Sequence, residues 1–468
     1  MNSNQYGNDE DLALDAKYRE MTEMPVSRLV IRLAIPTIIS MMVTAIYNVV
    51  DAVFVGHLST EATAGIGVSF AYMTFIQAMG FFFGHGSGNH ISRALGARRL
   101  DDASTMASVG FFLPLFIGII TGCVGLIYLP QLAIALGATP DVVPAACDYL
   151  RYILLASPFM MTAFTLNNQL RLQGNATLGM IGIGSGAVLN IILDPLFIFT
   201  LHLGISGASI ATAVSQFVAW ALLLWGTFRP GSVHISLKAF KPTGHILREI
   251  TAGGLPSLCR QVFNCISAIM LNYAAAKWAT PGNEASCVAA FAVVSRTMMF
   301  AFSFTLGFDQ GFQPVCGFNY GAGKYGRVRQ SYRFALAGST LILLFFSLCG
   351  IIFAPQIIAL FRDQDPMMIE VGTRVLRWQC FAFPLVGLST TTNMLFQNIR
   401  MTFRSTLLSI GRQGLFFIPA IIILPRLYGL HGVEMTQAVA DVLTFLLAVP
   451  FAIWIDRKLY RMEIQSQQ

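Results

Sequence analysis

The stretch GFFLPLFIGIITGCVGLIYL, residues 110–129, runs for 20 positions without a charged side chain. A second stretch, LAGSTLILLFFSLCGIIFA at residues 336–354, is equally apolar. A segment that crosses a membrane must satisfy its own backbone hydrogen bonds, so it is either a helix or a strand of a closed barrel. Barrel strands alternate in polarity over about 10 residues. Continuous apolar runs of about 20 residues instead predict helices that cross the hydrocarbon core.

The composition extends this conclusion to the whole chain. Of its 468 residues, 55% are hydrophobic and 11% are charged, and the mean hydropathy is +0.64. A soluble protein of this size carries about 25% charged residues to cover its surface. We therefore predict an all-α polytopic membrane protein. Twelve spans are predicted, at about 29–54, 63–87, 107–129, 146–170, 177–201, 207–228, 249–275, 286–310, 333–354, 371–397, 406–425 and 432–455.

The basic residues predict the orientation. With both termini on the inner side, the inner segments hold 20 of the 30 Lys and Arg residues, and the outer loops hold Lys277, Arg362 and Arg426. Inner loops of membrane proteins collect basic residues, so this bias accounts for the net charge of +7 without any nucleic acid partner. The eight cysteines are scattered without a CxxC motif and are interpreted as packing residues.

The two halves of the chain resemble each other. The matching pairs, at offsets of 220 to 226, are Pro36 with Pro256, Gly96 with Gly321, Arg151 with Arg377, Gly204 with Gly429 and Gly207 with Gly432. Six spans per half is an even number, so both halves enter the membrane in the same sense and a pseudo-twofold along the membrane normal is expected. The predicted parts are a cytoplasmic N-terminal tail (1–28), an N-lobe (29–228), a cytoplasmic linker loop (229–248), a C-lobe (249–455) and a cytoplasmic C-terminal tail (456–468).

Polar residues inside the first span share one helical face. Thr44, Tyr47, Asn48 and Asp51 stand at positions i, i+3, i+4 and i+7. An ionisable group in a span costs about 2.5–3.5 kcal/mol on insertion, so a coupling-ion or proton site is the preferred interpretation. A satisfied network of interhelical hydrogen bonds is the alternative.

The fifth span carries a second acidic group. Asn190 and Asp194 are four residues apart, and Pro195 removes the amide that would bond the carbonyl of Ile191. We expect a kink with a free carbonyl beside two oxygen-bearing side chains, and hard cations such as Na⁺ favour oxygen ligands. The alternative is a plain proline kink in which Asp194 is a cap or bonds a neighbour. Further polar candidates are Asn167 in the fourth span and Thr212 and Gln216 in the sixth.

The second half lacks an equivalent pair of carboxylates. Its candidate cavity residues are Arg260, Gln261, Asn264 and Arg296, and Arg377 with Asp441 is expected to form a structural ion pair. No GxxxxGK[ST], HExxH or GxSxG motif occurs, so neither an ATP-driven pump nor an enzyme is expected. His85 and His90, five residues apart, are not expected to bind a metal.

These residues resemble the MATE (multidrug and toxic compound extrusion) family, from Pro36 to about Asp456. The matching stretches are LAIP and YNVVDAVFVGHL in the first span, NIILDPLFIF in the fifth, LGISGASIATAVSQ in the sixth and GGLP in the seventh. The resemblance implies two six-helix bundles around a cavity, exporting organic cations against an inward flow of Na⁺ or H⁺.

The resemblance also implies a location for the coupling site. It is closer to the MepA-like and DinF-like prokaryotic branch, which places a cation site in the first lobe. Carried over by motif, that site falls on Asp51, Asn190 and Asp194, and less distinctively on Asn167 and Thr212. The NorM-like branch also uses carboxylates in spans 7 and 10, where this chain has other residues.

The resulting hypothesis is a secondary multidrug antiporter of the bacterial cytoplasmic membrane. It is expected to act as a monomer in the lipid bilayer on small organic cations, with no cofactor besides the coupling ion. The sequence leaves Na⁺ and H⁺ as alternatives. The rival hypotheses are a flippase for lipid-linked precursors, which the arginines of the second half favour, and a channel or receptor without coupled transport.

Overall fold

The computed structural model describes residues 3–56, 60–361 and 365–467, with side chains at 12–46, 63–361 and 365–466. Each predicted span falls on a helix. The spanning helices in these ranges are α2 (Val26–Gly56), α3 (Thr60–Gly96), α4 (Leu100–Ile127), α6 (Val143–Leu172), α7 (Ala176–Pro195), α8 (Gly204–Gly226), α9 (Gly244–Lys277), α10 (Glu284–Gly321), α11 (Tyr325–Ile352), α13 (Pro366–Asn398), the composite of α14 (Thr402–Ile410), η3 (Gly411–Leu415) and α15 (Phe417–Tyr428), and α16 (Leu430–Gln467).

The remaining elements are short or lie outside the spans. They are α1 (Ser3–Glu23), α5 (Leu129–Ala135), η1 (Leu196–Thr200), η2 (Leu237–Ala239) and α12 (Ala354–Ala359). The described ranges contain no β-strand. The predicted all-α class is therefore confirmed.

Ten helices of the described chain are long and apolar enough to cross a membrane on their own. The two other spanning helices, α9 and α13, are long enough to cross a membrane, with 34 and 33 residues, but they carry more polar side chains. Both pack against several neighbouring helices. Polar groups are tolerated at this depth where they face protein rather than lipid.

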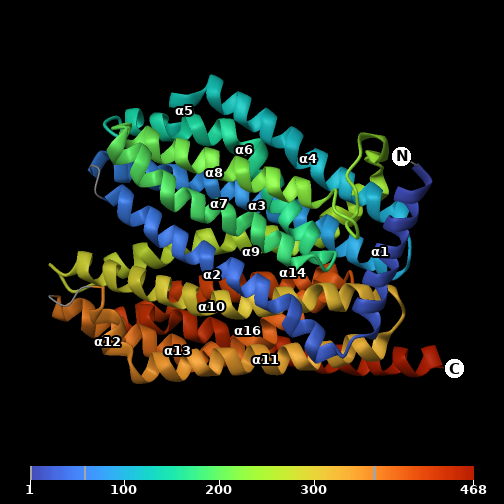
Figure 1. Ribbon diagram of the computed structural model, residues 1–468. Coiled ribbons are helices and arrows are strands. Elements are labelled where there is room, and N and C mark those ends of the chain that lie inside the picture. The colour runs from blue at the N-terminus through green and yellow to red at the C-terminus, as the bar shows by residue number, and fades with distance from the viewer. Residues whose placement is uncertain (1–2, 57–59, 362–364, 468) are drawn as a thin grey trace.

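The helices form two bundles (Figure 1). Helices α2 to α8 make up one bundle and α10 to α16 the other, with α9 running between them. The first span of each half crosses over to the other half, since α2 packs against α10 while α9 packs against α3. This exchange is reciprocal, as a pseudo-twofold between the halves requires.

Glycines mark the pseudo-twofold where α3 meets α10. A Cβ on Gly96 would lie 2.1 Å from the backbone oxygen of Phe318, and a Cβ on Gly321 would lie 2.1 Å from the backbone oxygen of Arg93. The two contacts are related by one offset of 225 residues. Only residues without a side chain allow the two backbones to approach this closely.

A second pair of glycines repeats a turn. Gly204 and Gly429 have φ angles of +57° and +59°, in the left-handed region that favours glycine. They stand at the start of α8 and directly before α16. The repeat inferred from the sequence therefore extends to backbone conformation.

Both ends of the chain lie at one end of the molecule, here named the terminal end (Figure 1). Helix α1 joins the two bundles there. Lys17 Nζ donates to the backbone oxygen of Gly174 at 2.7 Å, and Asn319 Nδ2 donates to that of Met21 at 3.0 Å. Burial lowers the pKa of Lys17, and the charge of Glu20 partly opposes that shift.

Candidate functional site

An acidic cluster lies inside the first bundle. Asn190 Nδ2 donates to Asp194 Oδ1 at 3.2 Å and approaches Thr212 Oγ1 at 3.4 Å. The three residues are at most 1% exposed. Asn190 and Asp194 come from one face of α7, and Thr212 comes from α8, which packs against it. The structure thus brings together three of the residues proposed from the sequence.

The proline next to this cluster ends the regular α-helix. Pro195 is the last residue of α7, and the chain continues as the π-helical turn η1. Proline lacks the amide that would continue the helical ladder. The helix is interrupted at the residue where the sequence predicts a kink, directly beside Asp194.

The candidate residues Tyr47, Asn48 and Asp51 of the first span are described by their backbone only. The side chains of Tyr47, Asn48 and Asp51 lie outside the described residues, although the backbone of α2 is helical up to Gly56. Helices α2 and α7 pack against each other, and Met41 and Met180 line the same small cavity.

Counted along their backbones from the shared cavity, Asp51 of α2 and Asn190 of α7 stand equally far along their helices. Asp51 and Asn190 each stand ten residues beyond these methionines, about 15 Å further along their helices. Both helices lead away from the terminal end, because α1 precedes α2 and contacts the turn before α7.

Two other candidates of the first half, Asn167 and Gln216, lie outside the cluster of Asn190, Asp194 and Thr212. The Asn167 side chain faces α7 at Gly179, where its Oδ1 lies 2.7 Å from the position of an added Cβ. Gly179 precedes Asn190 by eleven residues, which is about 16 Å of helix. Gln216 is half-buried one turn beyond Thr212 on α8.

The candidates of the second half do not form a single cluster. Gln261 Nε2 donates to Gln77 Oε1 at 2.9 Å and so links α9 to α3. Arg260 is half-buried, whereas Asn264 and Arg296 are exposed.

The predicted ion pair between Arg377 and Asp441 is wrong. Asp441 is 2% exposed and accepts from Arg412 Nε at 2.8 Å and from Gln437 Nε2 at 2.9 Å. Arg377 is exposed on α13. Arg412 lies in the π-helical turn η3, whose wider winding alters the direction of its side chain relative to a regular α-helix.

Asp309 is a buried acid next to the end of the predicted span 286–310. Helix α10 continues to Gly321, and Asp309 is fully buried. Ser339 Oγ donates to its Oδ1 at 2.5 Å, and Thr391 Oγ1 at 3.1 Å. The second bundle therefore holds a carboxylate of its own, held by hydroxyl groups.

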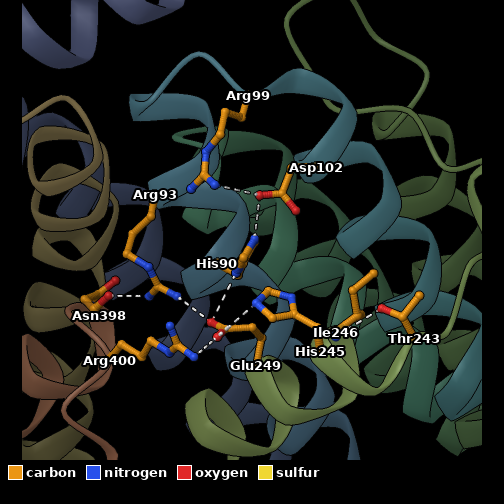
Figure 2. A network of polar contacts seen from close by, with 10 residues as sticks. All are labelled: His90, Arg93, Arg99, Asp102, Thr243, His245, Ile246, Glu249, Asn398 and Arg400. Carbon is orange, nitrogen blue, oxygen red and sulfur yellow. Dashed lines mark hydrogen bonds and ion pairs between the residues drawn. The ribbon is translucent and has the colours of Figure 1, made fainter.

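A further polar network joins the bundles at the terminal end (Figure 2). Its centre is Glu249 of α9, which is 3% exposed. Glu249 Oε2 lies 3.3 Å from His90 Nδ1 and 3.4 Å from Arg93 Nη2, both of α3, and Arg400 pairs with the other oxygen. His90 Nε2 also contacts Asp102 Oδ2 at 3.0 Å.

No pattern in the sequence indicates this network, because its members are spread over several helices. Among the described side chains, no group of three or more His, Cys, Asp or Glu residues is arranged to hold a metal ion. We interpret the network as a contact between the bundles, because it joins α3 to Glu249 of α9 and to Arg400 after α13.

Both halves of the chain match one family model, named MatE, over residues 36–196 and 256–423. The chain belongs to the MatE family. This MatE protein is 26% identical over 429 residues to the multidrug export protein MepA of Staphylococcus haemolyticus (strain JCSC1435), covering 91% of this chain and 93% of MepA. The resemblance to the MATE family and its MepA-like branch is confirmed.

Solved MATE structures share the fold of this MatE protein. A MATE transporter in complex with MaL6 superposes with a TM-score of 0.88 at 27% identity, covering 95% of this chain and 99% of that chain. The outward-facing conformation of a multidrug resistance MATE family transporter of the MOP superfamily gives 0.87 at 27% identity, covering 94% and 98%. The MatE protein is accordingly a multi-pass membrane transporter.

Proposed function

We propose that this MatE protein exports hydrophobic organic cations in exchange for H⁺ or Na⁺. The observation that carries the proposal is the buried cluster of Asp194, Asn190 and Thr212 beside the break in α7. The names of the relatives support drug export as the transported class and make a lipid-precursor flippase the less favoured alternative.

The chemistry of the cluster suits a coupling ion. A buried carboxylate is expensive unless it is neutralised by a proton, a cation or hydrogen bonds. Asp194 and Asn190 offer oxygen atoms, which H⁺ and Na⁺ both accept as partners. The register of α2 supports Asp51 as a further member of the site.

The contacts between the bundles support alternating access. Hydrogen bonds and close glycine contacts between the described parts of the bundles involve the second half of α3, from Gln77 onward, and the part of α10 from Gly307 onward. Both segments approach the terminal end. An arrangement closed at that end leaves the opposite end available to open.

The distribution of basic residues supports an orientation of the molecule in the membrane. We place the terminal end in the cytoplasm of a bacterial cell, because the predicted inner segments carry most of the Lys and Arg residues. The described arrangement then corresponds to a transporter closed toward the cytoplasm. A coupling ion shifts this arrangement only by its difference in affinity for the two states.

The test is ethidium transport by the reconstituted full chain, with a pH gradient and a Na⁺ gradient imposed separately. Asp194→Asn should abolish gradient-driven transport. Asp148→Asn, at an exposed acid in the same half, should transport like the unchanged protein. Full transport by Asp194→Asn under both gradients would refute the coupling role.

A further inference from the structure

Arg171 is a buried cation at the boundary between the bundles. It lies in the last turn of α6 and is 1% exposed. Its guanidinium donates to the backbone oxygen of Gln310 at 2.8 Å, to Gln313 Oε1 at 2.7 Å and to Asn168 Oδ1 at 2.9 Å, and lies 3.3 Å from His85 Nε2. None of these partners carries a negative charge.

The positive charge of Arg171 lacks a counter-charge among the described side chains. The charged group that acts on it most directly is Arg260, which is itself basic and also lies near His85. No described carboxylate forms an ion pair with Arg171. Burial of a charge is unfavourable unless the charge is paired, so the site is electrostatically suited to an anion.

A small cavity adjoins this guanidinium. Its walls include Ser40 of α2, Asn167 of α6, Ala176 of α7 and Gln310 of α10. Within the described structure, two buried polar atoms of the lining lack a hydrogen-bond partner, Arg171 Nε and Ser40 Oγ. The cavity has a volume of ≈ 10 Å³, which is at the lower limit for one species of about the size of a water molecule.

The start of α7 adds positive potential to that of the Arg171 guanidinium. Ala176 is its first residue, and the side chain of the preceding Asn175 makes no capping hydrogen bond. That side chain instead accepts from Lys17 and donates to Ser232. The amides of Leu178 and Gly179 donate to the backbone oxygen of Asn175, so the donors left at the start of α7 are the amides of Ala176 and Thr177, and the helix dipole favours an anion there.

We propose that this cavity binds a small monovalent anion of the halide class. The guanidinium of Arg171 supplies the charge, and Ser40 Oγ and the start of α7 supply further donors. The walls come from α2, α6 and α7 of the first bundle and from α10 of the second. The bound anion therefore stabilises the arrangement in which the bundles meet at the terminal end.

The probe is bromide or chloride, replaced by gluconate at constant pH and ionic strength. The purified full chain in lipid nanodiscs should show a thermal midpoint that rises with the logarithm of the halide concentration above the dissociation constant, as expected for a ligand of the folded state. Crystals grown with bromide should show anomalous signal between Arg171 and Ser40. A halide-independent midpoint together with no anomalous signal would overturn the proposal and indicate a water molecule in the cavity.

Variants separate this site from general effects of salt. Arg171→Gln should remove the rise of the thermal midpoint with halide, and Ser40→Ala should weaken halide affinity by about tenfold, as expected for loss of one hydrogen bond to an ion. Arg426→Gln removes an exposed arginine and should leave the response unchanged. If the thermal midpoint of Ser40→Ala and Arg171→Gln responds to halide as in the unchanged protein, the site is refuted. If Arg171→Gln does not fold, the result with Ser40→Ala is sufficient for the decision. The assay uses no drug and no ion gradient, so its outcome is independent of the export function.

Discussion

Replacement of Glu249 by glutamine should open the bundles at the terminal end. The carboxylate belongs to α9, and two of its partners, His90 and Arg93, belong to α3 of the other half. Glutamine has nearly the same shape but no charge. The Glu249→Gln variant therefore leaves the positive charge of Arg93 at the contact, where its side chain is 15% exposed, without its carboxylate partner.

The free-energy cost of Glu249→Gln follows from the burial of the ion pair between Arg93 and Glu249. Removing one partner of a buried ion pair costs about 3–5 kcal/mol. Because glutamine retains hydrogen-bonding capacity and Arg93 is partly exposed, we expect the lower end, about 3 kcal/mol. Only the arrangement with joined bundles loses this energy, so its population relative to an open arrangement should fall by about 10²-fold.

Hydrogen–deuterium exchange measures this opening without altering the eight native cysteines. In Glu249→Gln, the amides of residues 86–96 and 314–321, where α3 and α10 meet, should exchange about 10²-fold faster. The matched control is Glu434→Gln. Glu434 is 1% exposed and pairs with Arg374 at 2.8 Å, but both residues belong to the second half. The control should destabilise its own bundle without selective exchange in these two segments.

Unchanged protection of residues 86–96 and 314–321 in folded Glu249→Gln would refute the role of this carboxylate in joining the bundles. Equal acceleration in the Glu434→Gln control would refute it as well, since the effect would then reflect general destabilisation.

Three further variants test single contacts. Gly96→Ala places a Cβ within 2.1 Å of a backbone oxygen of α10 and should reduce ethidium transport strongly, whereas Gly67→Ala, with nothing within 4 Å, should not. Asp309→Leu leaves two buried hydroxyls without their acceptor and should lower stability by about 2 kcal/mol in thermal denaturation, more than Asp309→Asn does. Arg412→Gln leaves Asp441 buried without its cation and should lower stability by about 3 kcal/mol, part of which Asp441→Asn should restore in the double variant.

The spans were predictable because a membrane imposes one local requirement on each of them. A predicted span falls on every spanning helix of the described chain, and the offset between Gly96 and Gly321 indicates the relation between the halves. The structure adds that these two glycines touch the opposite half at equivalent points. A sequence repeat indicates symmetry, but it does not indicate which faces meet.

The acids were harder to predict, because hydropathy marks the hydrocarbon core and not the ends of helices. The predicted span ending at 310 placed Asp309 near its boundary, although α10 continues to Gly321 and buries that residue. Glu249 stood at the predicted start of a span, whereas α9 begins at Gly244. Both helices extend further toward the terminal end than the apolar pattern indicates.

The partner of Asp441 was mispredicted for a different reason. Which of two arginines, Arg377 or Arg412, reaches Asp441 depends on the rotation of three helices about their axes and on the π-helical turn η3. Sequence spacing gives the face of each helix but not the rotation of one helix relative to the next.

The symmetry of the fold does not extend to its charges, and this limits how the two halves can share one mechanism. The offset of 225 residues relates Arg93 on α3 to Phe318 on α10, and His90 to Val315. The backbone contacts at the pseudo-twofold are thus repeated, while Arg93 and His90, which contact Glu249 from α3, have no basic counterpart at the equivalent positions of α10. A motion that separates α3 from α9 must break the ion pair between Arg93 and Glu249, whereas the equivalent separation of α10 from α2 breaks the hydrogen bond from Thr37 Oγ1 to the backbone oxygen of Gly307. Opening at the terminal end should therefore respond to changes of charge on α3 and α9 far more than to changes at the equivalent positions of α10 and α2.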